Sequence, residues 1–525
     1  MKKILIAGLV AFSGISMQAQ DIDLSWGPTT KASSSDAAYQ PLGWYDNVYY
    51  TIKYDNGNGY LLKFDDKLNL IAQPELMTGQ KKFSAEMSYM NNGKLLLLDS
   101  EYEKDMKAAV IRAWTFTDDG RPSTIKEKVV AKFPVEKSKE VADLNFRYSP
   151  DQTKVLVFMT HDLGKKEESK VSMVVLNTSD LKVVWETSTT VPYLDEDFEM
   201  LSMAVDNSGN VIGLGVVRGG EGKRLAQYST RIFTFSTANE KYDDRELKID
   251  GKYISSAFIQ YTGASTIMIS GFYNGLTSKG KNEGIEGAFI AKTEIGNLQN
   301  LDLKVSQMSE STKASIAPQS SFAKFIGADE LNAYAMRNIN LRADGSGYVI
   351  AEQRFITRDL DSQGDRRTYY FNHIIIYNFD ENQNITWISA VPKLQMTSIT
   401  APVINLGVVV ISTWSSAMTR LAYKYNSYQQ VEINGKIYLL YNDHKENGDA
   451  VTLKETHVMS NKKNANAVLV AVDGNNGKWE KSTVFSGKEV DVILESSSCF
   501  PMENVGFTIS AEKGKDLQLG TITLK

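Results

Sequence analysis

Short hydrophobic runs separated by turns recur along the chain. Eight of them are rich in β-branched, aromatic or leucine residues: Tyr49–Tyr54, Leu95–Leu98, Val155–Met159, Val211–Val217, Thr266–Phe272, Tyr348–Glu352, Ile437–Tyr441 and Val505–Ser510. Each run is too short for a stable helix, and most follow a turn sequence such as Asn91-Asn92-Gly93 or Asn434-Gly435. Because Gly and Asn tolerate the positive φ of tight hairpins, the pattern predicts antiparallel strands joined by short turns.

A further strand-like run follows most of these eight runs. The following runs are Tyr60–Phe64, Val110–Phe116, Val171–Leu176, Arg231–Phe235, Ala288–Lys292, His373–Phe379 and Ala467–Val472. Three units continue into another strand that carries apolar residues or Trp, namely Val183–Glu186, Ile385–Ser389 and Lys478–Val484. The repeated unit is therefore expected to be a four-stranded antiparallel sheet. The first intervals between units are about 46 to 60 residues, slightly longer than a compact repeat of this kind, and the later ones are longer still.

A single sheet of this kind would leave two apolar faces exposed, and stacking the sheets radially in a closed ring buries both. The sequence thus predicts an all-β protein, a β-propeller of about eight blades over residues 20–525, with seven or six blades as alternatives. The last unit, Asp491–Leu524, supplies only three strand-like runs. We expect Asp21–Trp26 to add its outermost strand, so that the two ends of the chain close the ring.

Two segments do not follow the repeated pattern of strands and turns. The segment near 306–340 shows less alternation over Ser311–Asn338, which favours a short helical insertion over a strand. The segment near 397–427 contains the apolar run Val408–Trp414, which indicates either an extra hairpin or a misassigned strand. On a rigid ring, functional residues are expected in such insertions. The alternative is that the two insertions are solvent-exposed loops without a functional role.

The N-terminus has the pattern of a secretory signal peptide over residues 1–19. Lys2 and Lys3 precede the apolar stretch Ile4–Ile15, and cleavage is expected after Ala19. The protein is therefore expected to be exported, to the periplasm, the outer membrane or the cell surface. No cysteine lies near the cleavage site, which argues against a lipoprotein, and no later apolar run is long enough to span a bilayer.

Composition and charge narrow the classes of function. The chain is 42% hydrophobic and 23% charged with a formal net charge of −5, which is typical of a globular protein with a large core. No basic run stands out, so nucleic acid is not an expected partner. The single cysteine, Cys499, excludes an intrachain disulfide and a multi-cysteine metal centre.

Three unit ends share an apolar strand, an Asp- or Asn-rich turn, a second strand and a tryptophan. They are Val175–Glu186, Ile376–Trp387 and Val470–Glu480. This form resembles the blade ends of quinoprotein-type (PQQ-like) propellers. The resemblance implies that Trp185, Trp387 and Trp479 dock between adjacent blades.

Enzymes of the quinoprotein family use a calcium-assisted quinone pocket and usually a vicinal disulfide, which one cysteine cannot make. The family also includes propellers without a cofactor that act as scaffolds for outer-membrane machinery, and the chain departs from the enzymes in that direction. The chain also resembles exported propeller proteins of Bacteroidota envelopes in the segments Gly271-Phe272-Tyr273, Gly287-Ala288-Phe289 and Tyr438–Asp443. That resemblance implies a fold and a compartment but no activity.

Candidate chemistry is sparse. His161-Asp162 and Asp443-His444 each follow a second strand, where an acid/base pair could form at one rim; an ordinary loop pair is the alternative. His373 is a third candidate for the same chemistry. The four histidines have no local zinc-binding spacing, and the sequence contains no nucleophile elbow or phosphate-binding loop.

The alternating carboxylates Asp359, Asp361 and Asp365 partly match a calcium loop. Gln363 weakens the match, and Arg366 and Arg367 would compete for the carboxylates, so a solvated hairpin loop is the alternative. Ca²⁺ is thus the only candidate metal, and no cofactor is predicted.

These patterns favour a non-catalytic binding or scaffold protein of the cell envelope that engages a protein partner, expected in the outer membrane, through rim loops. One alternative is a glycan-active or quinone-linked periplasmic enzyme that uses rim carboxylates with His161, His373 or His444. The other is a carbohydrate-binding component of an outer-membrane uptake complex.

Overall fold

The computed structural model describes most of the chain beyond the N-terminal segment. The described residues are 22–31, 37–55, 58–76, 87–91, 94–117, 128–137, 140, 144–218, 228–235, 242–263, 265–277, 282–317, 333–360, 364–401, 403–405, 410–412, 421–487, 492–514 and 516–525. The predicted signal peptide, residues 1–19, lies outside these ranges. Within them, no helix is both long enough and apolar enough to cross a bilayer.

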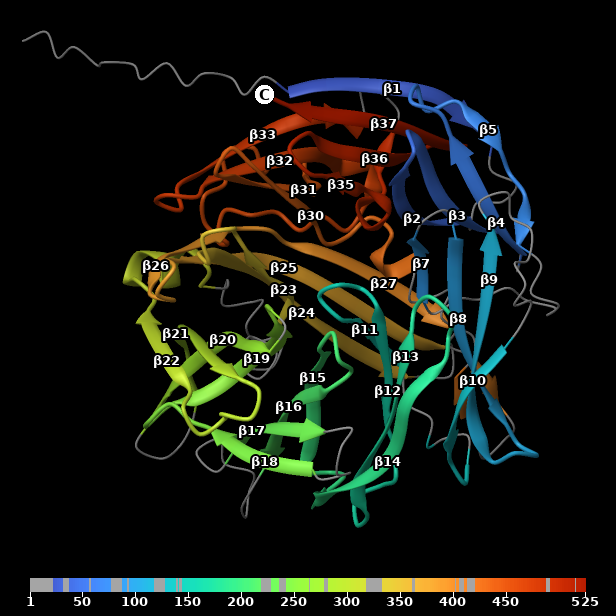
Figure 1. Ribbon diagram of the computed structural model, residues 1–525. Coiled ribbons are helices and arrows are strands. Elements are labelled where there is room, and N and C mark those ends of the chain that lie inside the picture. Colours follow the sequence, from blue (N-terminus) through green and yellow to red (C-terminus); the bar gives the residue numbers. More distant parts are fainter. Residues whose placement is uncertain are drawn as a thin grey trace, which may run out of the picture.

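Eight antiparallel sheets, each built on four strands, follow one another around a ring (Figure 1). The innermost strands of blades 1 to 8 are β2 (Ala38–Tyr45), β7 (Met87–Asn91), β11 (Asn145–Tyr148), β15 (Phe198–Val205), β19 (Tyr253–Tyr261), β23 (Tyr334–Leu341), β30 (Gln429–Ile433) and β34 (Ile493–Leu494). The second strands are β3 (Val48–Asp55), β8 (Lys94–Glu103), β12 (Lys154–Thr160), β16 (Val211–Arg218), β20 (Thr266–Leu276), β24 (Gly347–Leu360), β31 (Lys436–His444) and β36 (Gly506–Lys513). Seven of the eight hydrophobic runs predicted as strands lie wholly in these second strands, and the eighth, Val505–Ser510, begins one residue before β36.

The outer half of each blade completes the four-stranded pattern. The third strands are β4 (Asn58–Phe64), β9 (Ala108–Thr117), β13 (Glu168–Asn177), β17 (Tyr228–Phe235), β21 (Asn282–Glu294), β25 (Asp365–Phe379), β32 (Ala465–Asp473) and β37 (Asp516–Leu524). The outermost strands are β5 (Leu70–Ala72), β10 (Lys128–Pro134), β14 (Val183–Leu194), β18 (Tyr242–Leu247), β22 (Asp302–Gln307), β26 (Ile385–Val391), β33 (Trp479–Ser486) and β1 (Ile22–Thr30). The prediction of an eight-bladed, all-β propeller is confirmed.

The ring closes through pairing of the two chain ends. Strand β1 lies antiparallel to β37, with Ile22 opposite Leu524 and Trp26 opposite Gly520. The first strand of the chain is thus the outermost strand of the last blade, where the sequence analysis placed Asp21–Trp26. Since every strand of blade 8 except β1 comes from the C-terminal segment, this blade is incomplete without the N-terminal strand.

The hydrophobic core is divided among the interfaces between blades. In the described part of the chain, a separate apolar cluster joins each of the eight pairs of neighbouring blades. Between blades 6 and 7, for example, Ile350 and Ile376 pack with Leu439 and Val470. Between blades 8 and 1, Leu517 and Leu519 complete the circle. Stacking in a ring therefore buries both faces of each sheet, as the strand pattern predicts.

The three tryptophans of the quinoprotein-like unit ends dock on neighbouring blades. The indole N–H of Trp185 donates to the carbonyl of Gly209 at 2.7 Å, and that of Trp387 donates to Gly474 at 2.9 Å. The indole N–H of Trp479 donates at 2.9 Å to Ala390. In each case the acceptor belongs to the next or the preceding blade, so the docking role is confirmed.

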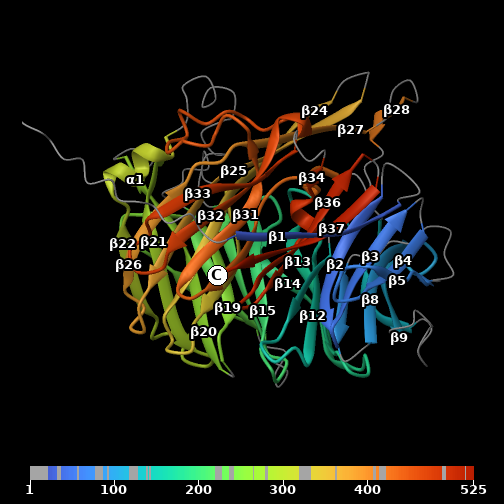
Figure 2. The same cartoon turned by 90° about the horizontal axis from the view of Figure 1, so that it is seen from above.

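Two kinds of loop lie on the same side of the ring because the strands of each blade alternate in direction. They are the loops that join the second strand of a blade to its third, and the loops that join one blade to the next. We call this side the upper rim. It carries the helix α1 (Glu310–Ser315), the far end of the long β24–β25 hairpin, and β27 (Gln395–Ala401), which adds to β25. Figure 2 shows α1, β24, β27 and β28 (Val403–Asn405) on one side of the molecule.

The two irregular segments differ partly from expectation. Among the described residues, α1 is the helical part of the segment Ser311–Asn338, and it begins where the Ser309 hydroxyl accepts from the Thr312 N–H at 3.1 Å. The end of that segment is strand β23 instead, and residues 318–332 lie outside the described ranges. The prediction of a helix there was wrong because Tyr334 and Ile339 are drawn into the core between blades 5 and 6.

The second irregular segment contains the extra hairpin that was one of its two interpretations. Strand β28 pairs with β29 (Val410–Ser412). The later residues of this irregular segment approach blade 8, since Lys424 forms ion pairs with Glu495 and Glu512, both at 3.0 Å. The remaining short elements are β6 (Glu75–Leu76), β35 (Phe500–Met502), η4 (Lys462–Asn464) and η5 (Ser496–Ser498).

Candidate functional site

A cavity of about 760 Å³ lies among the inner strands of blades 3 to 6. Its walls come from β11, β15, β16, β17, β19, β23 and β24. Most lining residues of β15, β19 and β23 lie in the first half of their strands, and the two of β16, Val216 and Arg218, lie near its end, which places the cavity toward the upper rim. The cavity therefore combines residues from four blades that are far apart in the sequence.

Arg147 in β11 is a cation on this wall without a carboxylate partner among the described residues. Its Nη1 donates to the carbonyl of Phe146 at 2.7 Å, whereas its Nε is buried with no hydrogen-bond partner. No acidic residue of the described ranges forms an ion pair with it, and burial lowers the pKa of its guanidinium. An uncompensated buried charge destabilises a fold, so a residue of this kind is suited to receiving an anion.

The other two arginines of the cavity are already neutralised. Arg218 forms an ion pair with Glu199, which is the only carboxylate among the described lining residues. Arg354 Nε lies 2.5 Å from Glu352 Oε2, and its Nη2 donates to the Ser427 hydroxyl at 2.7 Å. Arg147 is therefore the one arginine of the wall whose charge no carboxylate of the described residues balances.

The carboxylate of Glu352 belongs to a buried ionic network behind the cavity wall. Its Oε1 lies 2.7 Å from Lys393 Nζ, and both side chains are fully buried. Burial alone would raise the pKa of Glu352, but Arg354 and Lys393 hold it at about 2. The network fixes the orientation of Arg354 from behind.

Aromatic and hydroxyl groups form the rest of the lining. Tyr228 and Tyr253 contact each other edge to face, with ring centroids 5.7 Å apart. Ser256 is a lining residue whose buried hydroxyl has no partner. A wall with ring surfaces, hydroxyls and one arginine that no carboxylate of the described residues neutralises favours a ligand that has both an apolar face and an anionic group.

His373 lies directly behind the cavity. Its Nε2 is 2.8 Å from the hydroxyl of Tyr334, which lines the cavity. Burial lowers the pKa of His373 to about 3, and burial also raises the pKa of Tyr334. Both groups are therefore neutral at pH 7, and their contact is a hydrogen bond between neutral partners.

The two predicted His–carboxylate pairs are not formed. His161 is buried, and its Nε2 lies 2.7 Å from the Ser172 hydroxyl, while Asp162 is exposed. Asp443 is also buried, and its Oδ2 pairs with Lys481 at 2.9 Å. In each case successive residues of a strand end point in opposite directions, so one side chain enters the blade and the other does not.

The carboxylates of the proposed calcium loop are occupied by arginines. Asp365 is fully buried and accepts from Arg358 Nε at 2.9 Å and from its Nη2 at 3.1 Å. Asp359 pairs with Arg366 at 2.9 Å, and Asp361 lies outside the described residues. These cross-strand ion pairs match the competition expected from the neighbouring arginines and leave the calcium interpretation without support.

Sequence reasoning missed both the cavity and one surface cluster. Arg147, Glu199 and Tyr253 carry no local motif, and only the ring brings them together. His444, however, meets Glu446 and His457, whose ligand atoms all lie within 4.8 Å of one another. The available signal was that two of the four histidines occur in one loop, thirteen positions apart.

Comparisons with known proteins give a fold-level likeness. No model of a protein family matches the chain. No curated protein sequence matches it. Similar solved structures include the β-propeller domain of the Trilobed protease from Pyrococcus furiosus, at 9% identity over 89% of this chain and 96% of that chain, with a TM-score of 0.34.

Two further structures are similar to the same extent. The WD40 domain of SCAP from fission yeast is 7% identical over 96% of this chain and 98% of that chain, with a TM-score of 0.35. The polysaccharide lyase Uly1 is 11% identical over 76% of this chain and 85% of that chain, with a TM-score of 0.36. At these identities and TM-scores no function is carried over to this chain, which is a β-propeller of eight blades.

Proposed function

We propose that this protein is a non-catalytic binding protein that holds an acidic saccharide by its carboxylate in the cavity of blades 3 to 6. The observation that carries the proposal is Arg147, a largely buried guanidinium on the cavity wall that no carboxylate of the described residues neutralises. A planar guanidinium matches a carboxylate in geometry as well as in charge.

The remaining lining supports a sugar as the body of the ligand. Tyr228 and Tyr253 offer ring faces and edges for the apolar side of a pyranose, and Ser256 offers a hydroxyl. The volume of about 760 Å³ suits an oligosaccharide of a few residues.

Binding without turnover is favoured by the state of the candidate catalytic groups. Glu199 is held by Arg218, so it is poorly placed to act as a general base. The high pKa of Tyr334 and the low pKa of His373 both oppose proton transfer at neutral pH. The proposal requires no cofactor.

A partner protein in the envelope is a second proposal, supported by exposed apolar residues on the upper rim. Ile356 and Leu360, near the end of the β24–β25 hairpin, are 52% and 48% exposed. We propose that, after export, this hairpin docks on an outer-membrane partner. Ile356→Glu should abolish recovery of that partner from native membranes, whereas Ile71→Glu, at a similarly exposed position on blade 1, should not. Equal recovery with both variants would contradict docking through the hairpin.

The test of ligand binding is calorimetry with an acidic oligosaccharide, such as trigalacturonate, and its neutral methyl ester. The acid should bind and the ester should bind at least tenfold more weakly. Arg147→Met should weaken binding of the acid by about 10- to 100-fold, since a hydrogen bond to a charged group contributes roughly 1.5–3 kcal/mol. Affinity for the acid should also fall as the salt concentration rises.

The control is Arg366→Met, which removes an exposed arginine paired with Asp359, and neither residue lines the cavity. It should leave ligand affinity unchanged. Because Arg147 is an unpaired buried cation, Arg147→Met should keep or raise the melting temperature. Equal affinity for the acid and the ester, or an affinity that is the same with and without Arg147, would contradict the proposal.

A further inference from the structure

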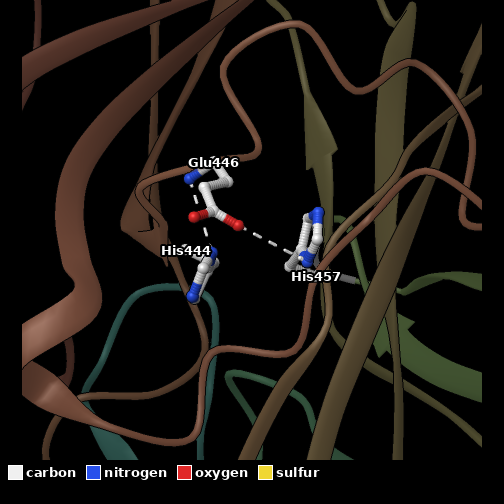
Figure 3. Close-up of side chains that lie close together, drawn as sticks. All are labelled: His444, Glu446 and His457. Carbon is white, nitrogen blue, oxygen red and sulfur yellow. Dashed lines mark hydrogen bonds and ion pairs between the residues drawn. The ribbon is translucent and has the colours of Figure 1, made fainter.

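The loop that joins β31 to β32 brings two histidines and a glutamate together on the upper rim of blade 7. Figure 3 shows the side chains of His444, Glu446 and His457 turned toward one another. The ligand atoms of all three lie within 4.8 Å of one another, and His457 Nδ1 is 3.7 Å from Glu446 Oε2. The imidazole rings are stacked with their centroids 5.4 Å apart. All three side chains are at least partly exposed, so an ion could reach them from solvent.

A buried polar scaffold beneath the loop fixes the distance between the two histidines. The side chain of Asn447 is fully buried and donates to Asp443 Oδ1 at 2.7 Å and to the carbonyl of His457 at 2.9 Å. Its Oδ1 accepts from the backbone N–H of His457 at 2.8 Å. Lys481 in β33 holds both Asp443 and the carbonyl of Asn447. The segments that carry His444 and His457 are therefore tied together independently of any contact between the two rings.

We propose that His444, Glu446 and His457 form a binding site for one divalent transition-metal ion, with Zn²⁺ as the representative case. Two imidazoles and one carboxylate are a ligand set that such ions accept, with further positions open to water or to a ligand from another molecule. Zinc bonds of about 2.1 Å place tetrahedral ligand atoms about 3.4 Å apart. The ligand atoms here, which lie within 4.8 Å of one another, need to close by about 1.4 Å at most, a shift on the scale of side-chain rotation.

The rest of the chain makes this site easy to isolate experimentally. The only other histidines, His161 and His373, are 2% and 3% exposed and bonded to Ser172 and Tyr334. The only cysteine, Cys499, is 1% exposed. Strong surface binding of zinc to the native protein should therefore come from the loop. The cavity lies in blades 3 to 6 and the metal cluster lies in blade 7. A negative result for saccharide binding would therefore not affect the proposed metal site, and the reverse also holds.

The first experiment titrates Zn²⁺ into the purified protein, without a polyhistidine tag, in competition with a fluorescent chelator. We expect one ion per chain to bind at micromolar concentration or below. His444→Ala and His457→Ala should each weaken binding by at least the 10- to 100-fold that outer-sphere changes cost at known sites. Absence of saturable binding, or binding that both variants retain, would overturn the proposal.

Glu446→Gln and Glu455→Gln form a matched pair, because both remove one negative charge from an exposed position of the same loop. Glu446→Gln should weaken zinc binding by tenfold or more. Glu455→Gln should leave it within twofold, since Glu455 is not part of the cluster and its carboxylate accepts from the N–H groups of Val451 and Thr452. Equal losses in the two variants would show general electrostatic attraction in place of a site.

A spectroscopic test identifies the ligand directly and does not depend on loss of binding. His457→Cys should still bind Co²⁺ and should gain a thiolate-to-cobalt charge-transfer band, because the new side chain is itself a metal ligand. Cys499 is buried and should contribute no such band in the unsubstituted protein. A folded His457→Cys protein that binds Co²⁺ without the band would overturn the assignment of residue 457.

Discussion

At the scale of single residues, the protein contains two kinds of buried charge. Glu352 and Lys393 are fully buried as a pair, and each carries further hydrogen bonds. Arg147 is largely buried, and within the described ranges the carbonyl of Phe146 is its one acceptor. The first kind is satisfied within the fold, whereas the second leaves a guanidinium whose best partner would come from outside.

The two buried histidines predict a pH dependence of stability. Burial lowers the pKa of His161 to about 4, with help from Lys170, and burial lowers the pKa of His373 to about 3. An unfolded histidine titrates near about 6.5, so below that pH the unfolded chain binds more protons than the native protein. The free energy of unfolding should therefore fall as pH is lowered from about 6.5 toward 4, by up to about 1.4 kcal/mol per pH unit for each histidine.

Urea unfolding of the protein and of His161→Gln at several pH values measures this effect. In the variant, the free energy of unfolding should depend less steeply on pH between about pH 6 and 4, by the equivalent of about one proton taken up on unfolding. Gln is chosen because its amide can keep a hydrogen bond to Ser172. Above about pH 7 the two proteins should differ by a constant amount, because neither state then takes up protons at position 161. An unchanged slope in the variant would contradict the low pKa of His161.

The candidate residues show why chemistry was harder to predict than strands. His161 and Asp443 were correctly placed at strand ends, but side chains of successive strand residues point to opposite faces. Which of the two enters the blade depends on its partners, Ser172 and Lys481, which are distant in sequence. The carboxylates Asp359 and Asp365 were predicted to face competing arginines, and this could be anticipated because both kinds of residue lie in one hairpin.

At the scale of elements, strand β1 holds the closing blade together. Its residues Leu24 and Trp26 pack on the cluster between blades 7 and 8, and the Trp26 ring lies edge to face with Phe485 at 5.3 Å. The pairing with β37 shifts register between Trp26 and Thr29. Because Ile22, Leu24 and Trp26 all precede this shift, the apolar contacts of β1 with the cluster come from the first half of the strand.

Replacing Trp26 by Ala should lower the free energy of unfolding by about 2–3 kcal/mol, less than the full cost for a completely buried aromatic residue because Trp26 is only partly buried. Ser25→Ala, at the exposed neighbouring position of the same strand, should change it by less than about 0.5 kcal/mol. Chemical denaturation of the two variants makes the comparison. Similar stability of both would mean that β1 contributes little to ring closure.

The segment from α1 to β23 shows the limit of local patterns. Ser309 and the polar residues after it make a short helix, as local capping predicts. Tyr334 and Ile339 then enter a sheet because they pack against Phe272 and other residues of the neighbouring blade. Composition alone favoured a helix over both parts, since a contact with another blade is invisible in a local window.

At the scale of the whole molecule, a ring without disulfides depends on every interface between blades. Cys499 lies in the cluster between blades 7 and 8, against which Leu24 and Trp26 of the closing strand β1 also pack. Burial raises the pKa of its thiol to about 12, and the side chain is 1% exposed. The thiol is therefore both inaccessible and protonated while the ring is closed.

Labelling of Cys499 with a thiol reagent should consequently report opening of the ring. The native protein should label slowly at neutral pH, and labelling should accelerate across the denaturant range in which the protein unfolds. Trp26→Ala should label faster than Ser25→Ala under the same conditions, and mass spectrometry of the labelled chain measures both rates. Rapid labelling in native buffer would indicate that blades 7 and 8 separate without global unfolding.

The sequence by itself predicted the strands, the four-stranded repeat and a ring of about eight blades. These properties depend on alternation and turn chemistry within a few residues, which remain visible in a linear chain. The docking role of Trp185, Trp387 and Trp479 was implied by the resemblance of their unit ends to quinoprotein-type blades. Only the tertiary structure decided that Arg147 and Arg354 share one cavity, and that the scaffold of Asn447 brings His444 to His457. Closure of the ring turns positions some two hundred residues apart into neighbours, and no local pattern encodes which side chains then meet.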